Sequence, residues 1–588
     1  MKNIKSLLIV ALLGSSFTSC NDFLTLDPLN DIVLENFWTD KSDVESVLLG
    51  AYSALESSDC LIRMSVWGEM RSDNIVEGNN APDDIKQISR ENLLYTNEYC
   101  QYNKFYDVIN RANTVLYFAP QVADKDPNYL IDELLAHESE AIAIRSLCYW
   151  YLIRSFRDVP YVKDPSIDDE GGHMKFFVPQ SSFENILDSL IRDLETIVDI
   201  EHNFKACYAV TKYSTDDANT GRITKGTICA MLADMYLWRG RADDYDKCIK
   251  VCEEVTKIKK QEYEKLRSKQ GKNCTITLFN GYPLISDAPD DIPGNSYNEI
   301  FGTGSSFESL FEFPYNNDVK NPFVGDYYQN NNSNNVGRIK AFDLIGSGFT
   351  SVKGNTVFEQ PQDTRYYSDL KERGSAFAIS KYAYDQVRLS ISEGTVKFTS
   401  GSFRNQVQAN WIVYRYTEVL LFEAEAYIMK AKALNPAGDD SLATVGVLKD
   451  YKDKAFELID AVNSRAIVAD NDKMLPTTLT QLIKYSANTT VADLETVLFK
   501  ERRRELMFEG KRWYDLVRMA RRDGNQDRLI GFVEKKYDAS VLGAVKIKLK
   551  NPYAMYFPMD KDEVRNSQNV LKQNPAYKDD EKIEQASH

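Results

Sequence analysis

The stretch GRITKGTICAMLADMYLWRG at residues 221–240 predicts the first half of a helical hairpin, and DDYDKCIKVCEEV at residues 243–255 predicts the second half. Apolar residues recur through both segments at helical spacing. The small side chains of Ala230 and Ala233 allow a neighbouring helix to approach closely. Gly240 can adopt the left-handed backbone conformation that ends the first helix. We therefore expect two helices that pack against each other.

A second pair of helices is expected at residues 411–429 and 450–463, joined by a longer connection that contains NPAG at residues 435–438. The spacing of the first pair resembles one tetratricopeptide repeat (TPR). One such unit cannot bury its apolar face alone, so several pairs should stack. We therefore predict a mainly α-helical chain that forms a TPR-like superhelix.

Three further segments towards the N-terminus are predicted to be helices. Residues 43–55 and 103–118 carry apolar side chains at i, i+3 and i+4, the pattern of an amphipathic helix. Residues 130–156 become apolar on nearly all sides after Ala141, which indicates a central, buried helix. Val159–Pro160 is expected to end it.

The middle of the chain, residues 260–410, has a different composition. It is rich in Gly, Pro, Asn and aromatic residues and shows no sustained helical period. We expect long loops and short strands laid over the helical frame. Binding residues tend to lie on long loops that a rigid scaffold positions, so this insert is expected to carry the ligand site.

The N-terminus has the features of a bacterial lipoprotein signal. Two lysines precede an apolar run at residues 7–13, and small and polar residues then lead to Cys20. The run is about half of the ~20 apolar residues needed to span a membrane. We expect residues 1–19 to be removed, Cys20 to be lipidated, and residues 20–33 to form a tether. The alternative is an ordinary secretory signal.

Composition excludes several classes of function. The formal net charge of −16 argues against nucleic acid or an anionic membrane surface as the principal ligand. The nine cysteines are widely scattered, and we expect mostly free, buried thiols with at most one disulfide. None of the four histidines lies at ligand spacing from another, so neither a metal site nor a cofactor is expected.

The sequence contains no GxSxG elbow, no GxxxxGK[ST] loop and no HExxH motif. Glu505 and Glu509 could be taken for the carboxylate pair of a glycoside hydrolase. The arginines around them instead favour ion pairs that lock a helix at residues 501–518. Arg145, in an apolar helix, is likewise expected to pair with a carboxylate of another helix. We predict that the protein is not an enzyme and has no catalytic residues.

Six blocks of the sequence, taken together and in order, resemble the SusD/RagB family of outer-membrane lipoproteins. They are residues 22–28, WGEMRSDN at 67–74, residues 140–160, RYTEVLLFEAEA at 415–426, ERRRELMFEGKRWYDLVR at 501–518, and residues 557–577. Arg157 and Ala576 stand where the family commonly has glycine. Members of the family capture nutrients, mostly glycans, together with a TonB-dependent transporter.

The resemblance implies one SusD-like domain at residues 34–588. Its helical frame would occupy about 34–260 and 411–520, its loop-rich insert about 260–410, and a C-terminal extension 521–588. It also implies a lipid-anchored protein at the cell outer membrane. Such a protein would bind oligosaccharides or polysaccharides and pass them, without catalysis, to a SusC-like TonB-dependent transporter.

Ligand residues are predicted from the chemistry of sugars, which present an apolar ring face and a rim of hydroxyl groups. A receptor therefore needs an exposed aromatic plane beside Asn, Asp, Gln or Arg side chains. Such residue types cluster early in the sequence and recur in the insert. The expected ligand-binding residues are Trp67, Arg71, Asp73, Asn74, Tyr282, Tyr297, Tyr315 and Tyr327.

Three alternatives to glycan capture stay open at this point. A peptide-binding member of the same family would favour backbone hydrogen bonds over aromatic stacking. A TPR-type adaptor would bind another protein in its concave helical face. A secreted glycoside hydrolase would need two carboxylates ~5–10 Å apart in a cleft.

Overall fold

The structure is a computed structural model. It describes residues 37–166, 177–200, 216–287, 294–328, 336–342, 357–360, 362–373, 376–392, 395–403, 408–435, 446–468, 485–486, 489–568 and 570–577. The expected signal peptide, Cys20 and the tether at residues 20–33 lie outside these residues.

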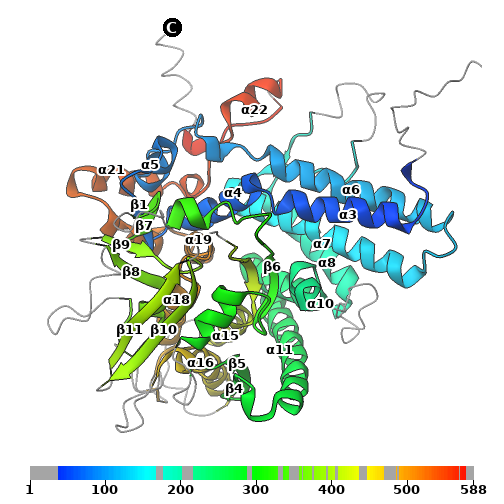
Figure 1. Cartoon of the computed structure of the whole chain (residues 1–588). Coiled ribbons are helices and arrows are strands. Elements are labelled where there is room, and N and C mark those ends of the chain that lie inside the picture. Colours follow the sequence, from blue (N-terminus) through cyan, green and yellow to red (C-terminus); the bar gives the residue numbers. More distant parts are fainter. Residues whose placement is uncertain are drawn as a thin grey trace, which may run out of the picture.

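Long helices form a continuous frame (Figure 1). They are α3 (Lys41–Leu55), α6 (Asn103–Ala123), α7 (Ile131–Phe156), α8 (Phe183–Val198), α10 (Lys225–Arg239), α11 (Ala242–Gln270), α15 (Tyr416–Leu434), α16 (Val447–Ala466) and α18 (Val491–Leu506). Each helix in this series packs against the next. This stacking confirms the predicted mainly helical superhelix.

Helix α7 is the central helix that its composition predicts. Every residue from Ala143 to Phe156 is buried. The helix ends at Arg157, which has a positive φ of 69°. Val159–Pro160 then forms the short strand β2, which pairs with β3 (Gln180–Ser181). Arg145 of this helix forms the expected inter-helix ion pair, 3.2 Å from Asp193 of α8.

The hairpin of α10 and α11 is confirmed, including the turn at Gly240, which has a φ of +65°. Helix α11 continues to Gln270 and is longer than expected. Its inner stripe extends through Val255, Lys259 and Tyr263, which are all buried at four-residue spacing. Residues 260–270 therefore belong to a frame helix and are not the start of the loop-rich insert.

The prediction of a helix at residues 411–429 is wrong at the N-terminal end. Trp411–Arg415 forms strand β12, which pairs with β6 (Ser309–Phe313), and α15 begins only at Tyr416. All five residues of the strand are buried. A short, fully buried apolar run has no periodicity that separates a strand from a helix, which explains the error.

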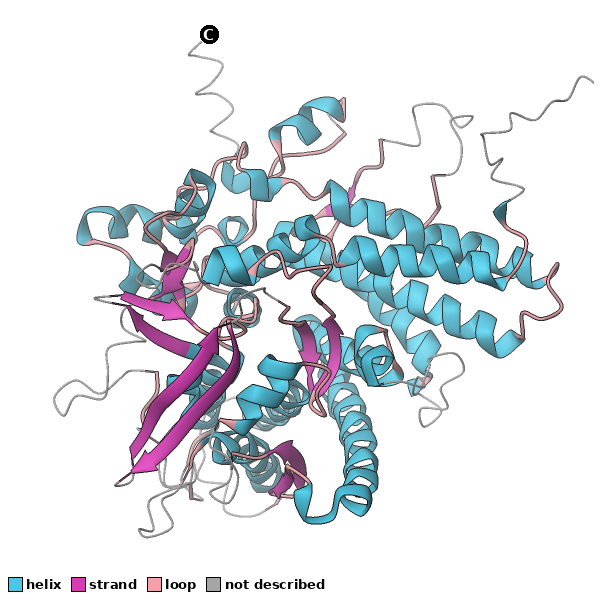
Figure 2. Ribbon diagram, in the orientation of Figure 1, coloured by secondary structure: helices cyan, strands magenta, loops and turns pink. Residues whose placement is uncertain are grey.

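The insert contains short antiparallel strands, as its composition predicts (Figure 2). One sheet has the order β1–β7–β9–β8, and two hairpins lie beside the frame. The strands are β1 (Ile75–Glu77), β4 (Ile276–Phe279), β5 (Tyr282–Ile285), β7 (Ile339–Ala341), β8 (Leu370–Arg373), β9 (Ala376–Ile379), β10 (Tyr384–Ser392) and β11 (Thr395–Phe403). Strand β1 lies early in the chain, so the sheet joins the insert to the N-terminal region.

Shorter helices close the frame. They are α4 (Ser58–Glu69), α5 (Asp83–Ser89), α9 (Asp216–Gly221), α12 (Asn295–Tyr297), α14 (Thr364–Asp369), α19 (Arg512–Asp523), α20 (Asp527–Val533), α21 (Ala539–Leu549) and α22 (Lys561–Asn566). The C-terminal segment returns to the core, where the Phe557 amide donates to the Ser155 carbonyl of α7 at 2.8 Å. It therefore packs as part of the same hydrophobic core.

The seven described cysteines are all free thiols, in agreement with the expectation. Cys20 and Cys207 lie outside the described residues. Within the described part of the chain, no helix combines the length and the apolar composition needed to cross a membrane.

Candidate functional site

The segment predicted as one helix at residues 501–518 is two helices joined by a tight turn. Helix α18 ends at Leu506 and α19 begins at Arg512. Between them Phe508 and Gly510 have φ values of 66° and 71°. The turn lies directly against α4, because a Cβ built on Gly68 would lie 1.7 Å from the Gly510 carbonyl oxygen. Glu505 therefore lies on α18 and Glu509 in the turn, so the prediction of a single helix at residues 501–518 is wrong.

These two glutamates are nevertheless both locked in ion pairs. Arg415 lies 2.6 Å from Glu505 and 2.8 Å from Glu509, and Lys381 lies 2.8 Å from Glu509. Burial alone would raise the pKa of Glu509, but Arg415 and Lys381 outweigh it and lower that pKa to about 2. Both side chains are almost completely buried. A general acid needs a raised pKa and access to substrate, so this pair is structural, as the arginines indicated.

Of the early predicted ligand residues, Trp67 and Arg71 lie in the core. The Trp67 indole donates to the Tyr99 carbonyl at 2.8 Å, and its ring stacks on Phe105 with centroids 5.0 Å apart. Arg71 donates to both carboxylate oxygens of Glu91, at 2.8 and 2.6 Å. Both side chains hold elements of the fold together.

Asp73 and Asn74 lie where this core meets α18 and α19. Arg512 and Arg503 lie 2.9 and 3.0 Å from the Asp73 carboxylate. Burial opposes ionisation of Asp73, but the two guanidinium groups lower its pKa to about 2. Asn74 accepts a hydrogen bond from Arg503 at 2.8 Å and donates to Glu69 at 2.8 Å.

The four predicted tyrosines are also buried, with at most 7% of each residue exposed. Tyr297 and Tyr315 donate to the carbonyls of Ser380 and Glu56, at 2.9 and 2.8 Å. Tyr327 stacks on Phe323 with centroids 4.5 Å apart, and Tyr282 lies in β5. These residues do not form the exposed aromatic plane that we expected. Whether any of the eight contacts a ligand stays a prediction.

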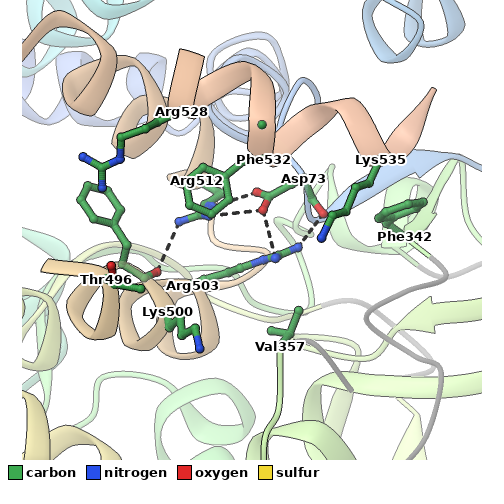
Figure 3. Close-up of a pocket in the computed structure, with 12 residues that line it drawn as sticks. Asp73, Phe342, Val357, Thr496, Lys500, Arg503, Arg512, Arg528, Phe532 and Lys535 are labelled. Atoms are coloured by element: carbon green, nitrogen blue, oxygen red, sulfur yellow. Dashed lines mark hydrogen bonds and ion pairs between the residues drawn. The ribbon is translucent and has the colours of Figure 1, made fainter. Parts of the chain in front are cut away.

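Asp73 opens instead onto a cavity of about 400 Å³, which we call the basic pocket (Figure 3). Two helix faces supply most of its wall. Its lining residues are Thr496, Phe499, Lys500 and Arg503 of α18, Arg512 of α19, Arg528, Gly531 and Phe532 of α20, and Lys535, Asp73, Phe342 and Val357. The spacing i, i+3, i+4, i+7 in α18 and i, i+3, i+4 in α20 puts these residues on one face of each helix.

Local sequence signals place the two helices. The Thr490 hydroxyl accepts a hydrogen bond from the Asp493 amide at 3.0 Å and caps the start of α18. Gly524, with a φ of +67°, ends α19 and lets the chain turn into α20. Arg503 and Phe532 are thereby brought to the same cavity from opposite walls.

The pocket combines aromatic rings with cations. Arg512 lies over the ring of Phe532, 5.0 Å from its centroid, and Arg528 lies over Phe499 at 5.5 Å. Figure 3 shows the Asp73 carboxylate between the guanidinium groups of Arg503 and Arg512. Such a mixed lining can hold a small polar molecule that has one apolar face.

Two further cavities differ in chemistry. The first, which we call the tyrosine pocket, measures about 300 Å³ and includes Tyr102, Tyr106, Asn110 and Glu563, and no lysine or arginine is among its lining residues. The second, of about 430 Å³, lies along α11 and mixes several lysines with glutamates. Within the described residues no cluster of three or more His, Cys, Asp or Glu could hold a metal ion.

Most residues that line the basic pocket were not predicted from the sequence. Only Asp73 was among the predicted ligand residues. Lys500, Phe532 and Lys535 come from helices more than 400 residues further along the chain, so no local motif joins them to Asp73. The available signal was the repeated spacing of cationic and aromatic residues along α18 and α20.

Comparison with known proteins identifies the family. The SusD family matches residues 312–577. SusD-like protein P38 of Formosa agariphila is 24% identical over 537 residues, which cover 88% of this chain and 91% of that protein. SusD-like protein P2 of the same organism is 23% identical, with the same two coverages.

Solved structures share the fold. A SusD homolog from Bacteroides thetaiotaomicron has a TM-score of 0.61 at 18% identity, covering 92% of this chain and 99% of that one. NanU of B. fragilis has a TM-score of 0.58 at 18% identity, covering 94% of this chain and 100% of that one. The chain thus belongs to the SusD/RagB family, whose members are non-catalytic nutrient-binding proteins of the outer membrane.

Proposed function

We propose that this protein captures oligosaccharides at the cell surface and passes them intact to a SusC-like TonB-dependent transporter. Lipid on Cys20 would hold it at the outer membrane, with residues 20–33 as the tether. Family membership supports the nutrient-binding role and, in general, a SusC partner. The glycan specificity and the partner of this chain are proposals.

One observation carries the glycan assignment. The basic pocket places phenylalanine rings beside guanidinium, ammonium and carboxylate groups within a volume of about 400 Å³. This volume is within the range of about 300–1,000 Å³ that is usual for small-molecule sites. The apolar face of a sugar can lie on a ring while its hydroxyl groups hydrogen-bond to the charged side chains. Stacking of a few sugar rings would give affinities of about micromolar to millimolar.

The lining of the pocket supports sugar over peptide. Most of its residues belong to α18, α19 and α20. Backbone groups inside a helix are already used in its own hydrogen bonds, whereas peptide capture by strand addition needs a free sheet edge. Binding in this cavity therefore depends on side chains.

Calorimetry of the lipid-free mature chain against a panel of oligosaccharides and peptides tests the proposal, with chromatography of the ligand afterwards. We expect saturable binding of at least one oligosaccharide, which is recovered intact. Binding of peptides alone would overturn the glycan assignment and keep the family role. Cleaved sugar would overturn capture without catalysis.

The anchor and the partner need their own test in cells. A Cys20→Ser variant should lose incorporation of radiolabelled palmitate and leave the membrane fraction. A TonB-dependent transporter should co-purify with the lipidated wild-type protein. Unchanged labelling of Cys20→Ser would contradict lipidation at this residue.

A further inference from the structure

We propose that the basic pocket selects acidic sugars, and that it binds the carboxylate of a uronic acid or the sulfate of a sulfated residue. The inference rests on the proposed capture of oligosaccharides and names the chemical class of the ligand. It follows from the charges of the lining, from their incomplete pairing, and from the rings beside them.

The charge of the pocket lining is opposite in sign to that of the whole chain. The whole chain is acidic, with a formal net charge of −16. The lining of the basic pocket has the opposite balance, because it contains five cations and one carboxylate, that of Asp73. A cavity lined by one sign of charge concentrates ligands of the opposite sign. The acidic remainder of the molecule argues against a long polyanion, since such a ligand would also run along repelling surface.

The two arginines nearest Asp73 are incompletely paired. One carboxylate faces both Arg503 and Arg512 and so balances only one of the two charges. The side chain of Arg503 is about 16% exposed, and it lines the cavity. Burial lowers the pKa of Arg503 to about 10 against the opposing effect of Asp73, so its charge is incompletely compensated. A second anion in the cavity would compensate it.

Two lysines of the pocket lining, Lys535 and Lys500, are available to a ligand. Within the described residues no ion-pair partner of Lys535 is found, and its side chain extends towards the Asp73–Arg503 pair in Figure 3. Lys500 lies 2.5 Å from Glu359, but the two side chains are 48% and 31% exposed. Exposed ion pairs contribute little to stability, so a ligand anion can replace Glu359 at little cost.

The phenylalanine rings of the lining favour an acidic sugar over an inorganic anion. Phe532 and Phe342 are half-buried and line the same cavity as the cations. A small inorganic anion would use the cations and leave these rings without a partner. An acidic sugar uses both, because its C–H face lies on a ring and its anionic group points to Lys500, Lys535 or Arg503.

The test is calorimetry of the lipid-free mature chain with matched probes. The acidic probes are an oligogalacturonate and a sulfated galactan oligosaccharide. Their controls are the carboxyl-reduced and the desulfated forms of the same oligosaccharides. We expect at least one acidic probe to bind at least tenfold more tightly than its neutral form, and its affinity to fall as salt rises from 50 to 200 mM.

Two variants locate the binding. Lys500→Gln and Lys535→Gln should each weaken binding of the acidic probe about fivefold. Lys125→Gln, which changes an exposed lysine just after the end of α6, should not weaken it. Inorganic sulfate should compete only weakly.

The other outcomes separate this inference from the function on which it rests. Equal binding of the neutral forms would overturn acidic selectivity and leave oligosaccharide capture intact. If both lysine variants bind the acidic probe as tightly as the wild-type protein does, the assignment of the binding to this pocket is overturned. An acidic peptide that binds with the same sensitivity to the variants would overturn the sugar class. If no oligosaccharide of the wider panel binds, the proposed function fails as well.

Discussion

The two faces of α18 contain similar residues and differ in how their charges are paired. On the inner face Glu505 lies 2.6 Å from Arg415 and 2.8 Å from Arg365, and all three side chains are buried. On the outer face Lys500 and Arg503 line the basic pocket, where one carboxylate faces several cations. Complete pairing on the inner face holds the scaffold together, whereas the incomplete pairing on the outer face is the basis of the proposed ligand site. Charge composition alone does not separate the two roles.

The largest expected effect comes from breaking the inner face. Arg415→Met should lower the free energy of unfolding by about 3–5 kcal/mol, because it leaves Glu505 and Glu509 buried without their shared partner. Urea unfolding measures the loss. Lys104→Met, which removes only an exposed pair with Asp107, is the control and should cost little. A similar cost for the two variants would mean that the buried network does not hold the frame.

Acid should weaken the same buried network of ion pairs, to which Glu509 belongs. The pKa of Glu509 is about 2 in the folded protein, against 4.5 for an ordinary glutamate. Because the folded value is the lower one, the stabilisation is complete above about pH 5 and is lost as the pH falls towards 2. At 1.36 kcal/mol per pKa unit this amounts to about 3 kcal/mol from Glu509. Unfolding free energies that stay constant between pH 5 and pH 3 would contradict the assignment.

Helix α15 offers an internal comparison of paired and unpaired carboxylates. Glu425 pairs with Arg518 and Arg522, at 2.8 and 2.9 Å, and its pKa is lowered because the arginines outweigh burial. Glu423 is also buried, but one of its carboxylate oxygens has no hydrogen-bond partner within the described residues. Burial, together with repulsion from Glu253, raises its pKa to about 8.

Glu423→Gln and Glu425→Gln should have opposite effects on the stability of the protein. The folded pKa of Glu423 lies above its unfolded value of about 4.5, so its carboxyl costs stability increasingly as the pH rises from 4.5 to 8. Glu423→Gln should therefore stabilise the protein by about 1–3 kcal/mol at pH 8 and hardly at pH 5. Glu425→Gln should destabilise it at both pH values. Thermal unfolding at the two pH values distinguishes these results.

The smallest effect on stability is expected at the outer face. The double variant Lys500→Gln, Lys535→Gln should change the free energy of unfolding by no more than about 0.5 kcal/mol, since Lys500 has only an exposed partner. The same variant should weaken the binding of an acidic oligosaccharide at least tenfold. Urea unfolding and calorimetry on one preparation test both parts. A large loss of stability would place these lysines in the scaffold.

The helical frame could be predicted because its signal is local. The stripes at residues 43–55 and 103–118, and Gly240 after α10, each fix an element without reference to the rest of the chain. The start of α15 and the break between α18 and α19 could not be predicted in the same way. Residues 411–415 are fully buried, and the turn at Phe508 depends on the close contact of Gly510 with α4.

The proposed ligand site was harder to predict from the sequence than the fold. Trp67 and the four tyrosines have the side chains that a sugar site needs, but burial uses their rings and hydroxyl groups inside the fold. The basic pocket arises where Asp73 meets α18 and α20, a contact that exists only after folding. Residue type alone therefore did not indicate the proposed site, which rests on how charges are paired in the folded chain.

The most direct test of the account is a crystal structure of the protein with the acidic oligosaccharide that binds best. We expect the carboxylate or sulfate to lie within about 3.2 Å of Lys500, Lys535 or Arg503, with a sugar ring against Phe532 or Phe342. A sugar bound in the tyrosine pocket, with the basic pocket holding no part of it, would contradict the account.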